Sequence, residues 1–123
     1  DVSIVTHGGS LWKCLEAADE LAEAGISAEV VDLRSLRPLD TDTILDSVAR
    51  THRLVVVDEG WKSVGLSAEI VAIVTEGALW ELDAPVRRVC GIEVPVPYAK
   101  HMEDASVPQV PGIVTAVHEV VGR

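Results

Sequence analysis

The chain has 123 residues, of which 48% are hydrophobic and 24% are charged; this is the composition of one globular domain and excludes a disordered chain, a collagen and a coiled coil. Twenty acidic and ten basic side chains give a formal net charge of −10, so a surface that neutralises the phosphates of nucleic acid or of anionic lipid is not expected. We expect a single domain over residues 1–123 and a partner with a basic surface.

The sequence carries no signal for a membrane span or for secretion. No run approaches the roughly 18 unbroken apolar residues of a transmembrane helix, and the N-terminus lacks the pattern of a signal peptide. We therefore expect no membrane partner and a cytoplasmic location, or the mitochondrial matrix if the source is eukaryotic. Cys14 and Cys90 lack a C-x-x-C partner, which predicts reduced, buried thiols. Because Asp1 stands at the edge of a strand-like run and the only methionine is Met102, we expect that the sequence was cut from a longer protein.

The first elements in chain order are a strand, a helix and a second strand. Residues 2–6 alternate as in a strand, and His7-Gly8-Gly9-Ser10 supplies a turn whose serine would cap the next helix. Gly25 is expected to end that helix, and residues 28–33 predict the second strand. The helix places its apolar residues on one stripe, namely Leu11, Cys14, Leu15, Ala18, Leu21 and Ala22.

The next segments predict a short helix and a central strand. Apolar residues on either side of Asp40 form a hydrophobic staple around an N-cap, which predicts a helix over 41–50. Leu54–Val57 is a continuous apolar run, typical of a parallel strand that is covered on both faces. It ends in Asp58-Glu59-Gly60-Trp61, and the carboxyl end of such a strand is where α/β sheets place their ligands.

The second half of the chain predicts two helices, a strand and a long loop. Residues 65–79 are apolar over more than one helical face, so this helix should pack on the sheet and on something else. Val86–Cys90 predicts a fourth strand, and its arginine pair suggests a sheet edge. Val94–Pro111 holds four prolines and predicts a loop of functional or interfacial type, followed by a helix over 113–121. The order of elements predicts a mostly parallel sheet with helices on both faces.

The glycine turn after the first strand does not match a known phosphate-binding motif. Gly8-Gly9-Ser10 lacks the spacing of G-x-G-x-x-G, and no G-x-x-x-x-G-K-[ST] is present. A helix N-terminus still attracts anions. One alternative for the function is therefore a stand-alone acidic α/β domain that binds a small anion or a nucleotide at residues 8–10.

Other chemistry-bearing residues have a structural reading beside the functional one. Asp58 and Glu59 could form part of a site, or one could cap the following helix while the other bonds loop amides. The four histidines lack metal-site spacing and are expected at the surface or an interface. Trp12 and Trp80 are expected to be core anchors, whereas Trp61 is expected to lie at a partner surface.

Three long segments resemble a known family. They are GISAEVVDLRSLRPLDTDTIL (25–45), RLVVVDEGWKSVGLSAEI (53–70) and the stretch from LDAPVRRVCG to VPVPYAKHMEDASVPQV (82–110). All three resemble the C-terminal domain of the beta subunit of thiamine-diphosphate-dependent 2-oxo acid dehydrogenases of the pyruvate, branched-chain and acetoin type. The resemblance covers essentially the whole chain and places it among transketolase C-terminal-like domains.

The resemblance implies a fold and a cofactor that lies elsewhere. The implied fold is a three-layer α/β/α sandwich with a mostly parallel, mixed five-stranded sheet that includes one antiparallel strand. The implied enzyme, an α2β2 heterotetramer or a fused equivalent, decarboxylates a 2-oxo acid and transfers the acyl group to a lipoyl arm. Its thiamine diphosphate and magnesium ion are held by the alpha subunit and by a pyrimidine-binding domain, so no catalytic, cofactor-binding or metal-binding residue is expected in this chain.

The resemblance also implies partners. This domain would pair with a second beta subunit, contact the alpha subunit and receive the basic subunit-binding domain of the acyltransferase component. The acid of the LDAP segment, Asp83, and the region around Arg123 are the implied contacts, while Arg87 and Arg88 bring nearby positive charge that could shift the partner's register. Further candidate interface residues are Asp58, Glu59, Trp61, Tyr98 and His101.

Overall fold

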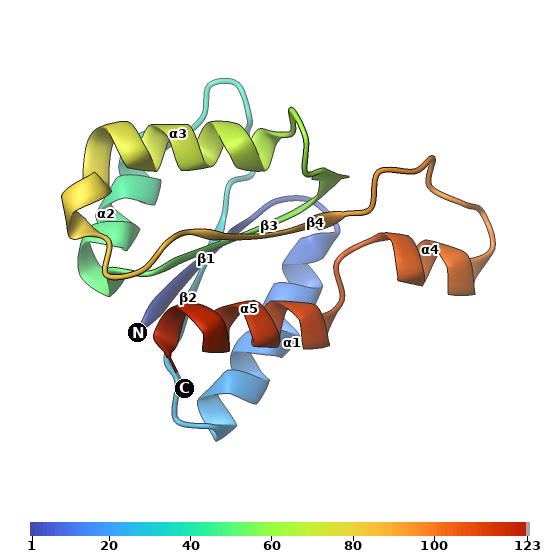
Figure 1. Cartoon of the computed structure of the whole chain (residues 1–123), viewed down its shortest axis with the longest axis horizontal. Helices are drawn as coiled ribbons and strands as arrows, with labels where there is room; N and C mark the ends of the chain where they lie inside the picture. Colours follow the sequence, from blue (N-terminus) through green and yellow to red (C-terminus); the bar gives the residue numbers. More distant parts are fainter. Residues whose placement is uncertain (123) are drawn as a thin grey trace.

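A four-stranded parallel sheet forms the middle layer of the structure, a computed structural model that describes residues 1–122 (Figure 1). Its spatial order is β2-β1-β3-β4, and each neighbouring pair is parallel. The first connection therefore runs from β1 to its neighbour β2 at one edge, and the second crosses back past β1 to place β3 on its other side. The strands are β1 (Val2–Thr6), β2 (Ala28–Asp32), β3 (Leu54–Trp61) and β4 (Arg87–Gly91).

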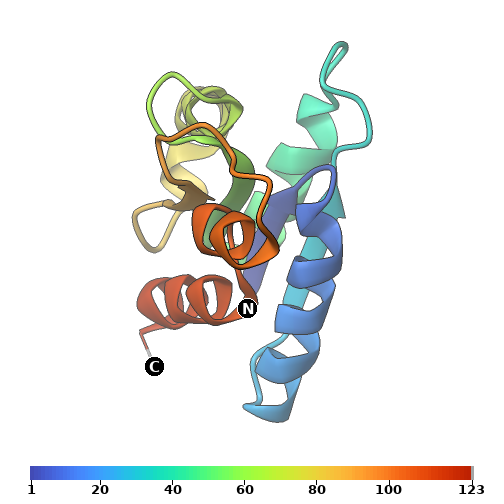
Figure 2. The ribbon, with the colours of Figure 1, turned by 90° about the vertical axis from the view of Figure 1, so that its right-hand side faces the viewer.

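Helices cover both faces of this sheet, as Figures 1 and 2 show. On one face lie α1 (Ser10–Glu23) and α5 (Val110–Val121). On the other face lie α2 (Thr41–Thr51) and α3 (Leu66–Ala78), and the single turn η1 (Leu79–Glu81) continues α3. This arrangement confirms the predicted α/β/α sandwich.

The central strands are buried on both faces because their side chains alternate between two apolar clusters. Val55 and Val57 join the cluster beneath α1 and α5, whereas Leu54 and Val56 join the one beneath α2 and α3. Strands in the middle of a parallel sheet need apolar residues at every position for this reason. The prediction of a covered central strand at Leu54–Val57 is confirmed.

Several local predictions match the structure. The Asp40 carboxylate accepts a hydrogen bond from the Thr43 amide (3.1 Å) at the start of α2, as the capping pattern indicates. That bond and the Thr43 hydroxyl lower the pKa of Asp40. Gly122 ends α5 with a φ of 76°, which favours glycine. β4 lies at a sheet edge, as its arginine pair suggests.

The first helix differs from the prediction in its cap and in its buried stripe. Gly9, not Ser10, occupies the N-cap position, and Ser10 is a buried residue of the first turn. Leu15 and Ala22 are exposed, because the helix presents a neighbouring stripe to the sheet. The buried residues of this helix are Ser10, Cys14, Ala17 and Leu21.

The sheet differs from the one that the family resemblance implies. Across residues 1–122 it has four strands, all parallel, and not five with one antiparallel. The segment after β4 adds no strand to the described sheet, and its closely spaced Pro95 and Pro97 each lack the amide donor that a sheet ladder needs. The pattern of the residues themselves predicts these same four strands.

The proline-rich segment is more structured than predicted. Residues 94–111 were expected to form a loop, but they include the short helix α4 (Lys100–Ser106) and the start of α5. Gln109 ties this segment to itself by donating to the backbone carbonyls of Asp104 (2.7 Å) and Val107 (3.2 Å). The segment before α4, at the right of Figure 1, loops out beyond the end of the sheet.

Candidate docking surface

The residue that the family resemblance singles out, Asp83, lies at the amino end of the parallel sheet. The residues before β3 and before β4 meet at this end, because parallel strands all begin on the same side, and the Asp83 amide donates to the His52 carbonyl (2.8 Å). In Figure 1 the chain also starts at this end, and α5 finishes there. We call His52, Arg53 and residues 79–83 the amino-end surface.

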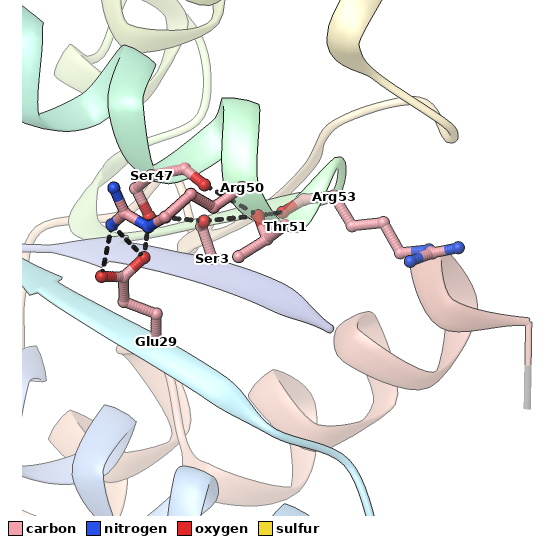
Figure 3. Close-up of polar contacts among 6 residues, drawn as sticks. All are labelled: Ser3, Glu29, Ser47, Arg50, Thr51 and Arg53. Carbon is pink, nitrogen blue, oxygen red and sulfur yellow. Dashed lines mark hydrogen bonds and ion pairs between the residues drawn. The ribbon is translucent and has the colours of Figure 1, made fainter.

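A partly buried polar network lies behind this surface (Figure 3). The hydroxyl of Ser3 on β1 lies 2.6 Å from that of Ser47 and 2.7 Å from that of Thr51, both on α2. Ser47 also donates to Glu29 on β2 (2.6 Å), and Arg50 holds the same carboxylate at 2.6 and 2.9 Å. The network links α2 to β1 and β2, and it therefore holds His52 and Arg53, which follow α2, in a fixed position.

Arg53 connects this network to Asp83. Its backbone carbonyl accepts the Ser3 amide (2.9 Å) and the Thr51 hydroxyl (3.2 Å), while its side chain points away from the network in Figure 3. The guanidinium Nη2 lies 3.4 Å from Asp83 Oδ2. The Asp83 side chain remains 58% exposed against 28% for Arg53. Asp83 is thus a surface carboxylate whose present partner is one half-buried arginine.

The first prediction concerns the Ser47 hydroxyl. The Ser47 hydrogen bond is the main cause, ahead of Arg50, of the lowered pKa of Glu29. A lowered folded-state pKa adds stability above the unfolded value near 4.5 and loses it as pH falls through the folded value. Ser47→Ala should therefore lower the free energy of unfolding at pH 7 by about 1–2 kcal/mol. It should also reduce the loss of stability as pH falls below the ordinary glutamate pKa, because that loss comes from protonation of Glu29.

Urea unfolding followed by circular dichroism at several pH values measures both effects. Thr75→Ala is a control that removes an exposed helical hydroxyl whose hydrogen bond goes to the backbone carbonyl of Val71 and not to a carboxylate. Equal slopes of stability against pH below 5 in Ser47→Ala and the unchanged chain would contradict the assignment of that pH dependence to Glu29.

An exposed tryptophan stands beside Asp83. Trp80 and Trp12 were expected to be core anchors, but they are 94% and 73% exposed, so that prediction is wrong. The helix α3 ends before Trp80, and the turn η1 directs Leu79 and Trp80 outward. The neighbouring acids Glu76 and Glu81 are exposed as well. An exposed tryptophan surrounded by carboxylates is typical of a site that docks a basic protein surface.

At the opposite, carboxyl end of the sheet, Asp58 organises the turn into α3. Its carboxylate accepts the Gly60 amide (2.8 Å) and the Ser67 amide (3.1 Å) in the first turn of the helix. The His7 ring nitrogen Nε2 lies 3.4 Å from it. Its side chain is 4% exposed, so a partner could not contact the carboxylate directly. Asp58 therefore lies behind the surface and not on it, and the helix-capping alternative describes it.

Glu59 points to the glycine turn. Ser10 Oγ donates to Glu59 Oε1 (3.4 Å), and a Cβ on Gly9 would lie 2.8 Å from the same oxygen. The carboxylate can approach this closely only because Gly9 has no side chain. An anion bound at residues 8–10 would face this negative charge at short range, so the turn does not support the alternative anion or nucleotide site.

The remaining predicted interface residues lie around the carboxyl end of the sheet. Trp61 is half exposed, and Tyr98 and His101 are exposed. Glu93 links this region to the turn after β3 by accepting the Ser63 amide (3.0 Å). We call residues 92–102 the apolar arm, since its exposed apolar side chains are Ile92, Val94, Val96, Tyr98 and Met102.

Metal-binding clusters and thiols are the remaining groups in the described residues that could carry chemistry. No group of three histidine, cysteine or acidic side chains within residues 1–122 lies close enough to hold a metal ion. Burial raises the pKa of the Cys14 thiol to about 11, and Cys90 is also a free thiol. None of the described helices is both long and apolar enough to cross a bilayer. Arg123, the other implied contact, lies outside the described residues.

Comparison with known proteins identifies similar chains. Residues 1–113 match the sequence model of the family described as "Transketolase, C-terminal domain". The mitochondrial pyruvate dehydrogenase E1 component subunit beta of Dictyostelium discoideum is 47% identical over 123 residues, covering 100% of this chain and 35% of that protein. The Arabidopsis thaliana subunit beta-1 is 52% identical over 116 residues (94% and 32%), and the human subunit beta is 44% identical over 121 residues (98% and 34%).

A solved structure has the same fold. A chain described as "Split gene transketolase, inactive beta4 tetramer" superposes with a TM-score of 0.84 at 29% identity, covering 99% of this chain and 38% of that one. The present chain thus spans about a third of the length of the curated relatives that it matches.

Proposed function

The chain belongs to the transketolase C-terminal domain family, and from this premise we propose that it is the assembly and partner-docking domain of the beta subunit of a pyruvate dehydrogenase-type 2-oxo acid dehydrogenase. The observation that carries the proposal is the identity of 44–52% with pyruvate dehydrogenase E1 beta subunits over nearly the whole chain. The complete enzyme would decarboxylate a 2-oxo acid and pass the acyl group to a lipoyl arm.

We propose that the chemistry takes place outside this chain. Thiamine diphosphate requires a metal ion to bridge its phosphates, and residues 1–122 hold no cluster of side chains suited to a metal ion. The Glu59 carboxylate, which lies against the glycine turn, would repel a diphosphate. The described residues therefore do not fit the cofactor, and the chain would contribute to catalysis by holding other subunits in place.

The apolar arm supports an assembly role. The segment that carries these five exposed apolar side chains loops out beyond the end of the sheet in Figure 1, and apolar side chains exposed close together in the chain are often covered by a protein partner. We propose that it contacts the second beta subunit or the alpha subunit. The tetrameric state named for the related transketolase structure is consistent with such a role.

The amino-end surface would receive the basic subunit-binding domain of the acyltransferase component. Asp83 already has a partner in Arg53, so an incoming cation must compete with that arginine for the carboxylate. The acids Glu76 and Glu81 add negative charge on the same side of the domain. Long-range attraction by such charges raises the association rate and is screened by salt.

Two substitutions test whether a cation of the subunit-binding domain replaces Arg53 at the Asp83 carboxylate. In the assembled enzyme, Asp83→Ala should weaken docking of the subunit-binding domain by about 1–3 kcal/mol if the carboxylate becomes desolvated in the complex. Arg53→Met should strengthen docking, because it frees the carboxylate while keeping an apolar stem. Isothermal titration calorimetry with the isolated subunit-binding domain measures both.

The matched control is Asp19→Ala, which removes an exposed aspartate from α1. It changes the net charge equally and should leave the affinity nearly unchanged. If Asp83→Ala and Arg53→Met both bind the subunit-binding domain with unaltered affinity, Asp83 is only a turn residue before Pro85. If the assembled enzyme does not bind the subunit-binding domain at all, the docking function is refuted.

For the compartment, we propose the mitochondrial matrix over the cytoplasm. The names of the pyruvate dehydrogenase relatives place those proteins in mitochondria. Separation of organelles followed by immunodetection tests this in a eukaryotic source.

A further inference from the structure

A cleft opens between the outer edge of β4 and the helix α5, away from the residues discussed so far. Its volume is about 590 Å³, which is within the range of small-molecule sites. Part of its wall is apolar, formed by Pro111 and Ala116 of α5. Its charged lining residues are Lys62, Arg87, Arg88 and Glu119, and Val86, Gly112 and Thr115 complete the wall.

The charge of this cleft is opposite to that of the chain. Three cationic side chains line it against a single carboxylate, whereas the whole chain carries a formal charge of −10. Like charges gathered at short range repel one another, and an anion bound between them would relieve that repulsion. Within residues 1–122, Glu119 is the one acid that lines the cleft.

Arg88 is held in place by two contacts with the segment after β3. Arg88 Nη1 donates to the Lys62 backbone carbonyl (2.8 Å) and contacts Ser67 Oγ (3.4 Å), so it fastens the turn after β3 to the edge strand. This contact fixes the backbone of Lys62 at the rim of the cleft. Preorganised donors of this kind lower the cost of ordering side chains on binding.

Arg87 keeps donors available despite its pairing. Its Nε lies 2.9 Å from Glu119 Oε2, and both side chains are about half exposed. A guanidinium carries five N–H donors, so the terminal nitrogens can still bind an oxyanion while Nε holds the glutamate. Lys62 presents a point charge from the other wall, and two such groups can hold one anionic group between them.

We propose that this cleft is a binding site for a small organic anion that carries a phosphate or carboxylate group. Lys62 and Arg87 bind the charged group, Arg88 positions Lys62, and Pro111 with Ala116 contact the carbon skeleton of the ligand. The site is separate from the amino-end surface and does not depend on the proposed docking function.

Calorimetric titration of the purified chain with inorganic phosphate and with citrate, at constant ionic strength, tests the site. At least one probe should bind saturably with a dissociation constant near or below about 1 mM. The probe that binds more tightly identifies the ligand group as phosphate or carboxylate. Lys62→Ala and Arg87→Ala should each weaken binding about tenfold, the loss expected for one charge-assisted hydrogen bond.

Two further variants separate a site from a general charge effect. Glu119→Gln should tighten binding at least about twofold, because it removes the opposing charge and releases Arg87. Lys100→Ala removes an exposed lysine that is paired with Asp104 on α4, and it should leave binding unchanged. Circular dichroism verifies that each variant is folded.

The proposal is overturned if neither probe saturates below about 10 mM, which is weaker than any specific site of this size. It is equally overturned if folded Lys62→Ala and Arg87→Ala bind as the unchanged chain does, or if Lys100→Ala weakens binding as much. The arginine pair would then serve only to protect an exposed sheet edge from pairing with other chains.

Discussion

Gly65→Ala is expected to destabilise the domain by about 3 kcal/mol or more, among the largest effects of any single substitution in this chain. The backbone of Gly65 is extended (φ −87°, ψ 167°), so alanine could adopt its conformation. The obstacle is space, because a Cβ there would collide with the Trp61 carbonyl oxygen. Backbone atoms must move to relieve this contact.

That movement would disturb the start of α3. Gly65 is the N-cap of the helix, and the Asp58 carboxylate that accepts the Ser67 amide at 3.1 Å is only 3.6 Å from the same notional Cβ. Displacing the turn would weaken a buried, charge-assisted hydrogen bond as well as creating strain. Both effects act in the folded state.

Equilibrium unfolding in urea measures the loss, with Gly112→Ala as the control. The nearest atom to a Cβ on Gly112 is Val89 Cγ1 at 3.8 Å, which is an ordinary contact. This change lies in the first turn of α5 and should alter stability by less than about 1 kcal/mol, in the stabilising direction. A loss below 1 kcal/mol for Gly65→Ala, comparable with that of a typical surface substitution, would contradict the steric argument.

Trp80→Ala should weaken docking of the acyltransferase's subunit-binding domain by about 2–4 kcal/mol, or roughly 30- to 1000-fold in affinity. This expectation rests on the proposed function. An indole that is 94% exposed can bury a large apolar area on association, and Asp83 is close enough in the chain to bind a cation beside it. The free energy of unfolding should change little, since the side chain makes almost no buried contact in the isolated domain.

Trp12→Ala is the matched control for this prediction. Trp12 is 73% exposed, but it lies in the first turn of α1, at the carboxyl end of the sheet. Its removal should leave the affinity for the subunit-binding domain unchanged when measured by the same titration. Equal weakening by both tryptophan substitutions, or none by Trp80→Ala, would remove Trp80 from the docking surface.

The local elements were predictable from the sequence because their causes are local. The alternation of Val2–Thr6, the capping aspartate at position 40 and the glycine at position 122 act over a few residues, and the structure confirms each. The continuous apolar run at Leu54–Val57 likewise indicated a strand covered on both faces.

The side of a helix that is buried was less predictable, because it depends on the elements against which the helix packs. α1 buries Cys14, Ala17 and Leu21, and the apolar residues Trp12 and Leu15 remain exposed. An apolar residue indicates a possible contact, but the neighbouring element decides which side of the helix is covered.

The family resemblance pointed to Asp83, but the tertiary structure decided the partners of the residues at both candidate sites. Arg53 and Asp83 are thirty residues apart, and Arg87 and Glu119 are thirty-two apart, yet each pair meets across elements that only the sheet order brings together. Asp58 illustrates the same limit, since its position at the end of a strand suggested a site, but in the structure it is buried and accepts the Ser67 amide at the start of α3, which makes it a capping residue. Ion pairs, clefts and exposure depend on distances between segments far apart in sequence, and composition and periodicity carry no information about those distances.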